Sequence, residues 1–325
     1  MQSTNNPKLQ NQINAGTIGR KTGHRYEEEL TNRLNAMPMP YKSAIVTMGI
    51  INTGQPHIIL LEKVLKYVDW DYVDKVEAYA TGILATSEHG MKNIEIDGIP
   101  IKSSKSDVIL ILYKGDKSIN IGVSVKQCNT SKPTNAQIFF TTASAFYNLL
   151  TTNGIELSTD ALKSMRQFCG DNGYRPLDDM DCSNRMSNPE RYFWEETDNK
   201  GLKEWESAFH IHQDTITRLI MQKGYANDPF PPQIIFHKTK KADNVNQQEI
   251  AIFSIDEFLE LSRKYMGFNC DKYRVKKGRY KEPVEICHHA PRFGVIQMQR
   301  GGQKQHPTQL QFNLKAGYFY LLAKL

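Results

Sequence analysis

Two apolar segments flank a short polar one near the middle of the chain. Residues 108–113 (VILILY) and 119–125 (INIGVSV) are rich in β-branched and aliphatic side chains. The residues between them include Gly115 and Asp116, which favour a turn. This pattern predicts a hairpin of two buried strands.

A helical period appears closer to the N-terminus. Tyr26, Leu30 and Leu34 recur at the spacing of one helix face, and two prolines follow at 38 and 40. The spacing predicts an amphipathic helix over residues 23–35. Similar patterns predict helices at 57–68, 201–222 and 255–266, a strand-rich segment at 75–113, and strands at 233–238, 249–254, 295–299 and 310–314.

The segment after the hairpin is apolar over most of its length. Residues 136–150 read AQIFFTTASAFYNLL, and Thr134 and Asn135 precede them as capping residues. We expect one buried helix here. Further on, residues 169–189 are rich in Gly, Pro, Asn and Asp, which is typical of a long loop or a domain joint.

Composition fits a globular protein. The 325 residues are 39% hydrophobic and 10% aromatic. No apolar run approaches the ~18 residues of a membrane span, and the polar residues 1–19 lack the apolar segment of a signal peptide. We expect a cytoplasmic protein with a short flexible arm. Five cysteines without a CxxC pair indicate reduced thiols.

Basic charge gathers at the C-terminal end. Residues 270–325 hold 11 Lys and Arg against three acids, an excess larger than the +6 of the whole chain. The rest of the protein is therefore slightly acidic. Basic charge concentrated in one region favours a polyanionic partner such as nucleic acid.

The hairpin also carries candidate chemistry. Asp107 stands at the start of its first strand, and Ser124 and Lys126 share one face at the end of its second. Metal-assisted phosphodiester hydrolysis needs a cation ligand and a group that orients water. The Asp107 carboxylate and the Val125 carbonyl suit Mg²⁺, and Lys126 suits the water. A second carboxylate must come from elsewhere.

These residues resemble the PD-(D/E)xK nuclease superfamily, which includes most type II restriction endonucleases. Under that resemblance Asp107 is the second acid of the motif and Lys126 its lysine. Family members often carry a further metal-binding Glu after an aromatic residue on the preceding helix, a pattern that Tyr26 and Glu27 match; Glu28 is the alternative. Two positions depart from the motif, because Ser106 replaces its proline and Ser124 replaces its acid. We expect Glu27 to supply the missing carboxylate.

A second set of residues suits DNA recognition. Glutamines pair with adenine and arginines with guanine in the major groove, while lysines contact phosphates. A polar surface hairpin is the competing interpretation of the same segment. The candidate base readers are Gln297, Gln299, Arg300, Gln303, Lys304 and Gln305, and the candidate phosphate contacts are Lys276, Lys277 and Arg279.

The resemblance implies an α/β fold: a restriction-endonuclease-like core, with a mixed sheet flanked by helices at residues 20–168, and an α+β DNA-recognition region at 169–325. We expect a Mg²⁺-dependent type II restriction endonuclease acting on double-stranded DNA, as a homodimer if the target is palindromic. The alternatives are a structure-selective repair nuclease or junction resolvase, and an inactive DNA-binding protein. An HNH interpretation of His288 and His289 lacks a metal-binding residue after Asn313.

Overall fold

The computed structural model describes residues 23–44, 47–81, 94–96, 98–101, 104–179, 189–223, 228–277, 280–281, 283–300 and 308–325. The chain forms two compact units. Unit 1 comprises residues 1–136, 221–261 and 316–325, and unit 2 comprises residues 137–220 and 262–315. The chain thus crosses between the units after residues 136, 220, 261 and 315, which differs from the single expected boundary at residue 168.

Unit 1 is built on a six-stranded mixed sheet of order β2-β11-β10-β8-β7-β4. Strand β8 is antiparallel to β7 and parallel to β10, and the other neighbours are antiparallel. The predicted hairpin is confirmed, with Gly115 and Asp116 between its strands. The strands are β2 (Ile51–Gly54), β4 (Lys75–Ala80), β7 (Val108–Lys114), β8 (Lys117–Gln127), β10 (Pro232–Lys238) and β11 (Gln248–Ser254).

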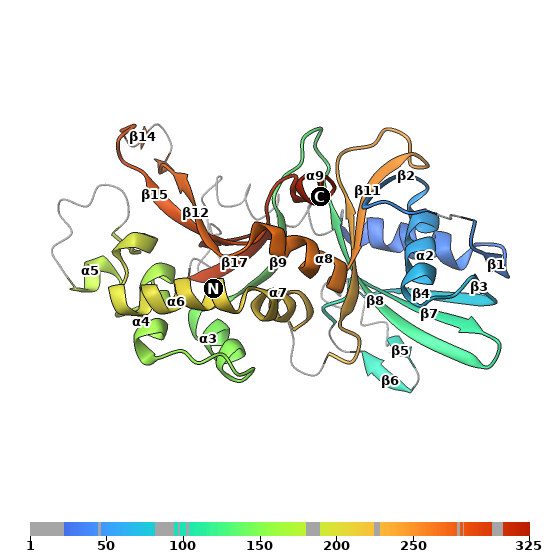
Figure 1. The fold of residues 1–325 in the computed structure, drawn as a ribbon, viewed down its shortest axis with the longest axis horizontal. Helices are drawn as coiled ribbons and strands as arrows, with labels where there is room; N and C mark the ends of the chain where they lie inside the picture. Colours follow the sequence, from blue (N-terminus) through green and yellow to red (C-terminus); the bar gives the residue numbers. More distant parts are fainter. Residues whose placement is uncertain are drawn as a thin grey trace, which may run out of the picture. The chain divides into compact units, whose positions relative to one another are not determined.

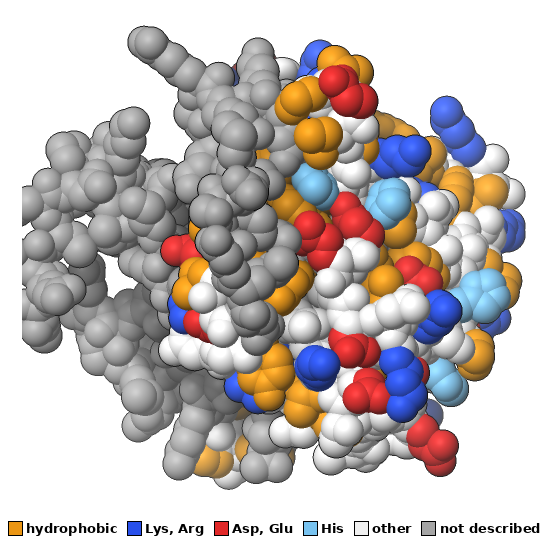
Figure 2. All heavy atoms as spheres, turned by 90° about the vertical axis from the view of Figure 1, so that its left-hand side faces the viewer, with side chains coloured by type: hydrophobic (Ala, Val, Ile, Leu, Met, Phe, Trp, Pro, Cys, Tyr) orange, Lys and Arg blue, Asp and Glu red, His pale blue; other side chains and the backbone are white. Residues whose placement is uncertain are grey.

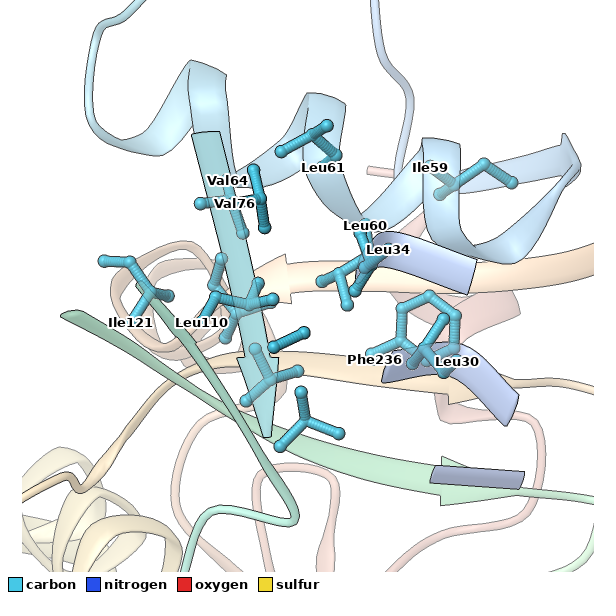
Figure 3. Packing of buried hydrophobic residues seen from close by; sticks show 14 of the residues in the cluster. Leu30, Leu34, Ile59, Leu60, Leu61, Val64, Val76, Leu110, Ile121 and Phe236 are labelled. Carbon is cyan, nitrogen blue, oxygen red and sulfur yellow. The ribbon is translucent and has the colours of Figure 1, made fainter. Parts of the chain in front are cut away.

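Two helices pack on this sheet through the predicted apolar positions. The helix at residues 23–35 (the N-terminal helix) contributes Leu30 and Leu34 to the core, and α2 (Pro56–Tyr67) contributes Leu60. Figure 3 shows these side chains beside Phe236 of β10. The α/β class and the mixed sheet flanked by helices are therefore confirmed (Figure 1).

Smaller elements complete unit 1. The chain enters it within α7 (Gln213–Gln222) and leaves it at the end of α8 (Ile255–Ser262). Two short strand pairs and a final helix are added: β1 (Tyr41–Lys42) with β3 (Tyr72–Val73), β5 (Ile94–Ile96) with β6 (Ile99–Ile101), and α9 (Tyr318–Leu322).

Unit 2 has its own five-stranded sheet, of order β12-β15-β16-β17-β9. Its core is aromatic: Phe146 stacks on Trp205 with ring centroids 5.5 Å apart, and Phe209 on Phe293 at 4.7 Å. The strands are β9 (Ala136–Thr142), β12 (Phe268–Tyr273), β15 (His288–Phe293), β16 (Ile296–Arg300) and β17 (Gln309–Leu314), with β13 (Lys276–Lys277) paired to β14 (Tyr280–Lys281). The helices are α3 (Ala143–Thr151), α4 (Thr159–Cys169), α5 (Pro176–Asp179) and α6 (Asn199–Ile211), with 3-10 turns η2 (Trp194–Glu196) and η3 (Arg263–Tyr265).

The helix expected over residues 136–150 is wrong in its first half. Residues 136–142 form strand β9, and α3 begins only at Ala143. Thr142 is the capping residue, since its hydroxyl oxygen accepts the Ala145 N–H at 3.2 Å. Residues 138–140 (IFF) are apolar without interruption, so their pattern does not distinguish a buried strand from a buried helix. Across the described residues, no helix has both the length and the apolar character to cross a membrane.

Gly122 lets β8 lie close to the segments that precede its two neighbouring strands, β7 and β10. A Cβ on Gly122 would lie 2.6 Å from the Pro231 carbonyl oxygen and 2.9 Å from that of Phe230, and closer still to the Ser106 hydroxyl. Real Cβ atoms do not approach other atoms so closely, and two of the three obstacles are backbone. The close approach of these segments therefore depends on the absence of a side chain at residue 122.

We predict that Gly122→Ala lowers the free energy of unfolding by about 1–3 kcal/mol, because the strand must move to admit the methyl group. Gly54→Ala in β2 is the matched control, since its Cβ would meet Ile59 Cδ1 at an ordinary 3.7 Å. Urea unfolding of both variants measures the difference. Equal stability of the two variants would contradict the close approach.

Candidate active site

The first candidate ligand lies where β7 begins. The Asp107 backbone N–H donates to the Val123 carbonyl at 2.9 Å, and its carbonyl accepts the Thr81 N–H at 3.0 Å. Val108 pairs with Val123, so Asp107 lies opposite the last part of β8. The antiparallel register thus brings residues from the two ends of the hairpin sequence together, as expected from the sequence.

The Asp107 carboxylate is held mainly by β8. Its Oδ2 accepts the Val125 N–H at 2.7 Å, the Lys126 ammonium at 3.0 Å and the Ser124 hydroxyl at 3.3 Å. Lys126 Nζ also donates to the Val125 carbonyl at 3.0 Å. Within the described chain, no donor reaches Oδ1 of Asp107. One oxygen is therefore fixed by the protein, and the other remains open.

The second carboxylate comes from the N-terminal helix. Glu27 is only 7% exposed, whereas Glu28 is exposed. The Glu27 Oε2 atom is buried and has no hydrogen-bond partner among the described residues. Burial, and then the negative charge of Asp107, raise the pKa of Glu27 to about 8, although Lys126 opposes this. Glu27 therefore lies within electrostatic reach of both hairpin residues.

These groups fit a divalent metal ion. Two carboxylates near each other, one with an unsatisfied buried oxygen, are a costly arrangement without a cation between them. Hard cations such as Mg²⁺ prefer carboxylate and carbonyl oxygens. Glu27, Asp107 and the Val125 carbonyl would hold the ion. A bound ion would supply positive charge for a phosphate and a more acidic water.

The two departures from the family motif have clear local roles. Ser106 is 1% exposed; its hydroxyl donates to the Phe230 carbonyl at 2.6 Å, and its carbonyl accepts the Thr81 hydroxyl. Through these two hydrogen bonds Ser106 holds the segment before Asp107 against Phe230 and Thr81. Ser124 donates to Asp107, so it supports the first carboxylate without adding a third negative charge.

Three nearby residues were missed by the sequence interpretation. The Lys105 N–H donates to Asp228 Oδ2 at 2.5 Å. Burial, and then the charge of Lys126, lower the pKa of Lys105 to about 7. His237 lies beside Lys126 in the parallel pairing, and burial lowers its pKa to about 3, so it is uncharged at neutral pH. The position of Lys105 two residues before Asp107 could have identified it from the sequence as a neighbour of the site. Asp228 and His237 could not be identified in this way, because only the β8–β10 pairing brings them close to Asp107 and Lys126.

The expected DNA-reading residues lie in unit 2 and are only partly described. Gln297, Gln299 and Arg300 belong to β16, within the predicted strand pair rather than a loop. Gln303, Lys304, Gln305 and Arg279 lie outside the described residues. Lys276 and Lys277 form β13, and their side chains are likewise outside the description.

No protein-family profile matches this chain, and no curated protein matches it at a significant level. The functional inference therefore rests on the residues and their geometry.

We predict that Glu27→Gln weakens Mn²⁺ binding at least about tenfold, because it removes a negative oxygen ligand from the site. Mn²⁺ prefers the same ligands as Mg²⁺ and is followed by electron paramagnetic resonance. Glu28→Gln is the control, since that neighbour is exposed. An equal effect of both changes, or of neither, would rule out Glu27 as a ligand.

Proposed function

We propose that this protein is a Mg²⁺-dependent endonuclease of the type II restriction kind, with a core like that of the PD-(D/E)xK nucleases. Its substrate would be double-stranded DNA. The observation that carries the proposal is the contact of Lys126 with Asp107 beside the buried Glu27. This combines two acids and a lysine at one end of a hairpin within a mixed sheet.

Each residue then has a distinct task. Asp107 and Glu27 would hold the cation, and Ser124 and the Val125 N–H fix the Asp107 carboxylate. Lys126 is 18% exposed, so its ammonium can reach a water molecule and a phosphate oxygen. Water attacks phosphorus directly and releases a proton to solvent, a new P–O bond forms, and the bond to the 3′ oxygen breaks as that oxygen takes up a proton from solvent. The products carry 5′-phosphate and 3′-hydroxyl ends.

The contacts in unit 2 favour a second candidate, a nuclease that recognises the shape of DNA. Gln297 donates to Asp271 Oδ2 at 3.2 Å and accepts from Gln299 at 2.7 Å. Arg300 donates to the Tyr192 carbonyl at 3.0 Å. Side chains held in this way are less able to reach into a major groove than a free loop is. A repair nuclease or junction resolvase would retain the same catalytic residues.

We predict that the wild-type protein cuts phage DNA in Mg²⁺ and that Lys126→Ala slows cutting at least about 100-fold. Lys117→Ala is the control, because this lysine is on the same strand but exposed and remote from Asp107. Gel electrophoresis and sequencing of the fragment ends measure the outcome. One shared sequence at the ends supports restriction activity, and cutting only at branched DNA supports the second candidate.

Salt-dependent DNA binding without cutting by any of these proteins would contradict the catalytic proposal. It would leave the inactive DNA-binding alternative, with Ser124 as the residue that displaced the acid. A melting curve of each variant shows whether it is folded.

A further inference from the structure

Unit 2 contains a hollow on its sheet that the proposed chemistry does not use. Its volume is about 360 Å³, within the range of sites for small ligands. Strands β12, β15 and β16 line it, together with Phe168 at the end of α4 and Arg191. Every lining residue belongs to unit 2.

One wall of the hollow holds the Tyr273 ring and the Arg300 guanidinium, both of which are partly exposed. The Arg300 guanidinium lies 5.4 Å from the ring centre of Phe168 and 5.1 Å from that of Phe193. It is fixed by hydrogen bonds to the Tyr192 carbonyl at 3.0 Å and the Tyr273 hydroxyl at 3.2 Å. Phe168 and Phe193 are almost fully buried, so they support the guanidinium, while the Tyr273 ring is the aromatic surface open to a base. Aromatic rings and planar guanidinium groups are surfaces on which an unstacked base packs.

A row of hydrogen-bonding groups crosses the hollow. Asn313 donates to Gln299 Oε1 at 3.2 Å, Gln299 donates to Gln297 Oε1 at 2.7 Å, and Gln297 donates to Asp271 Oδ2 at 3.2 Å. Lys315 fixes the carboxylate of Asp271 at 3.2 Å. The amides therefore have defined orientations. An amide nitrogen carries two hydrogens, and Gln299 uses one of its two within the described residues.

Two positive charges lie near each other at this site. Burial, and then the charge of Arg300, lower the pKa of Arg191. The charge of Glu190 acts in the opposite direction, and an anion bound near both guanidinium groups would further reduce their repulsion. On the face that Figure 2 shows, basic side chains are interspersed with acidic ones rather than gathered into one patch. The hollow therefore combines a place for an anion with a planar, hydrogen-bonding place for a neutral ring.

We propose that this hollow binds a single unstacked nucleotide of a DNA strand. Its base lies against Tyr273 and its edge meets Gln299, while Arg191 and Arg300 face its phosphate. A simple anion fits less well, because the Asp271 carboxylate also lines the hollow. The choice of DNA as the source of the nucleotide rests on the proposed function. The role of unit 2 is then to recognise a base turned out of the duplex.

The test compares two short fluorescein-labelled duplexes in EDTA, one fully paired and one with a single unpaired base, by fluorescence anisotropy. Unstacking and unpairing cost least for a base that is already unpaired. We expect the wild-type protein to bind the unpaired duplex about tenfold more tightly. Gln299→Leu reduces this preference at least about fivefold. Gln137→Leu, an exposed glutamine on β9 of the same sheet, leaves it unchanged.

A second measurement does not depend on any variant. 2-Aminopurine at the unpaired position is fluorescent, and the bound protein should protect it from quenching by acrylamide. Equal affinity for the two duplexes, an unprotected 2-aminopurine, or a preference unaffected by Gln299→Leu would overturn the proposal. If phage DNA is still cut in that case, the proposed nuclease function stands. Binding of free 2-aminopurine deoxynucleotide without any DNA binding would overturn both the nuclease function and the binding of a DNA nucleotide. The hollow would then be a site for a free nucleotide.

Discussion

The antiparallel pairing of β7 with β8 is the constraint on which the candidate site depends. It places Asp107 opposite the end of β8, where one backbone N–H and two side chains converge on a single carboxylate oxygen. A shift of one residue would turn Lys126 to the opposite face of the sheet. Such a shift is opposed by the buried side chains of both strands, from Val108 to Leu112 and at Ile121 and Val123. The same apolar pattern therefore specifies the fold and aligns the charged groups.

The buried apolar side chains of unit 1 also make it possible to hold two carboxylates, Glu27 and Asp107, near each other. Glu27 follows Tyr26 and precedes Leu30 on a helix whose apolar side chains are almost completely buried. Their burial contributes about 1.5–3 kcal/mol for each large side chain, which offsets the cost of holding a carboxylate out of water beside Asp107. The high pKa of Glu27 reflects that cost. A cation is the natural partner for the pair, and a site formed before the cation arrives loses little entropy when it binds.

Sequence patterns predicted the hairpin and the N-terminal helix because both depend on local spacing. The buried position of Glu27 also followed from Leu30 and Leu34, since the leucines define the inner face. Contacts that depend on distant segments were not predictable in this way. Asp228 reaches Lys105 only because β10 pairs with β8. The division into units was missed for a similar reason: the chain between β8 and β10 leaves unit 1 and forms much of unit 2.

The glutamines expected to read bases show how a confirmed strand prediction can still change a functional interpretation. Gln297 and Gln299 alternate with buried Ile296 and Met298, as the pattern indicated. On a free loop they would adapt to many base pairs, but on a strand their amides are fixed by Asp271 and Asn313. A fixed row of donors and acceptors discriminates well only when the ligand comes to it. A base that has left its stack can enter such a site. A rigid hollow on a sheet therefore suits an unstacked nucleotide better than it suits the groove of an intact duplex.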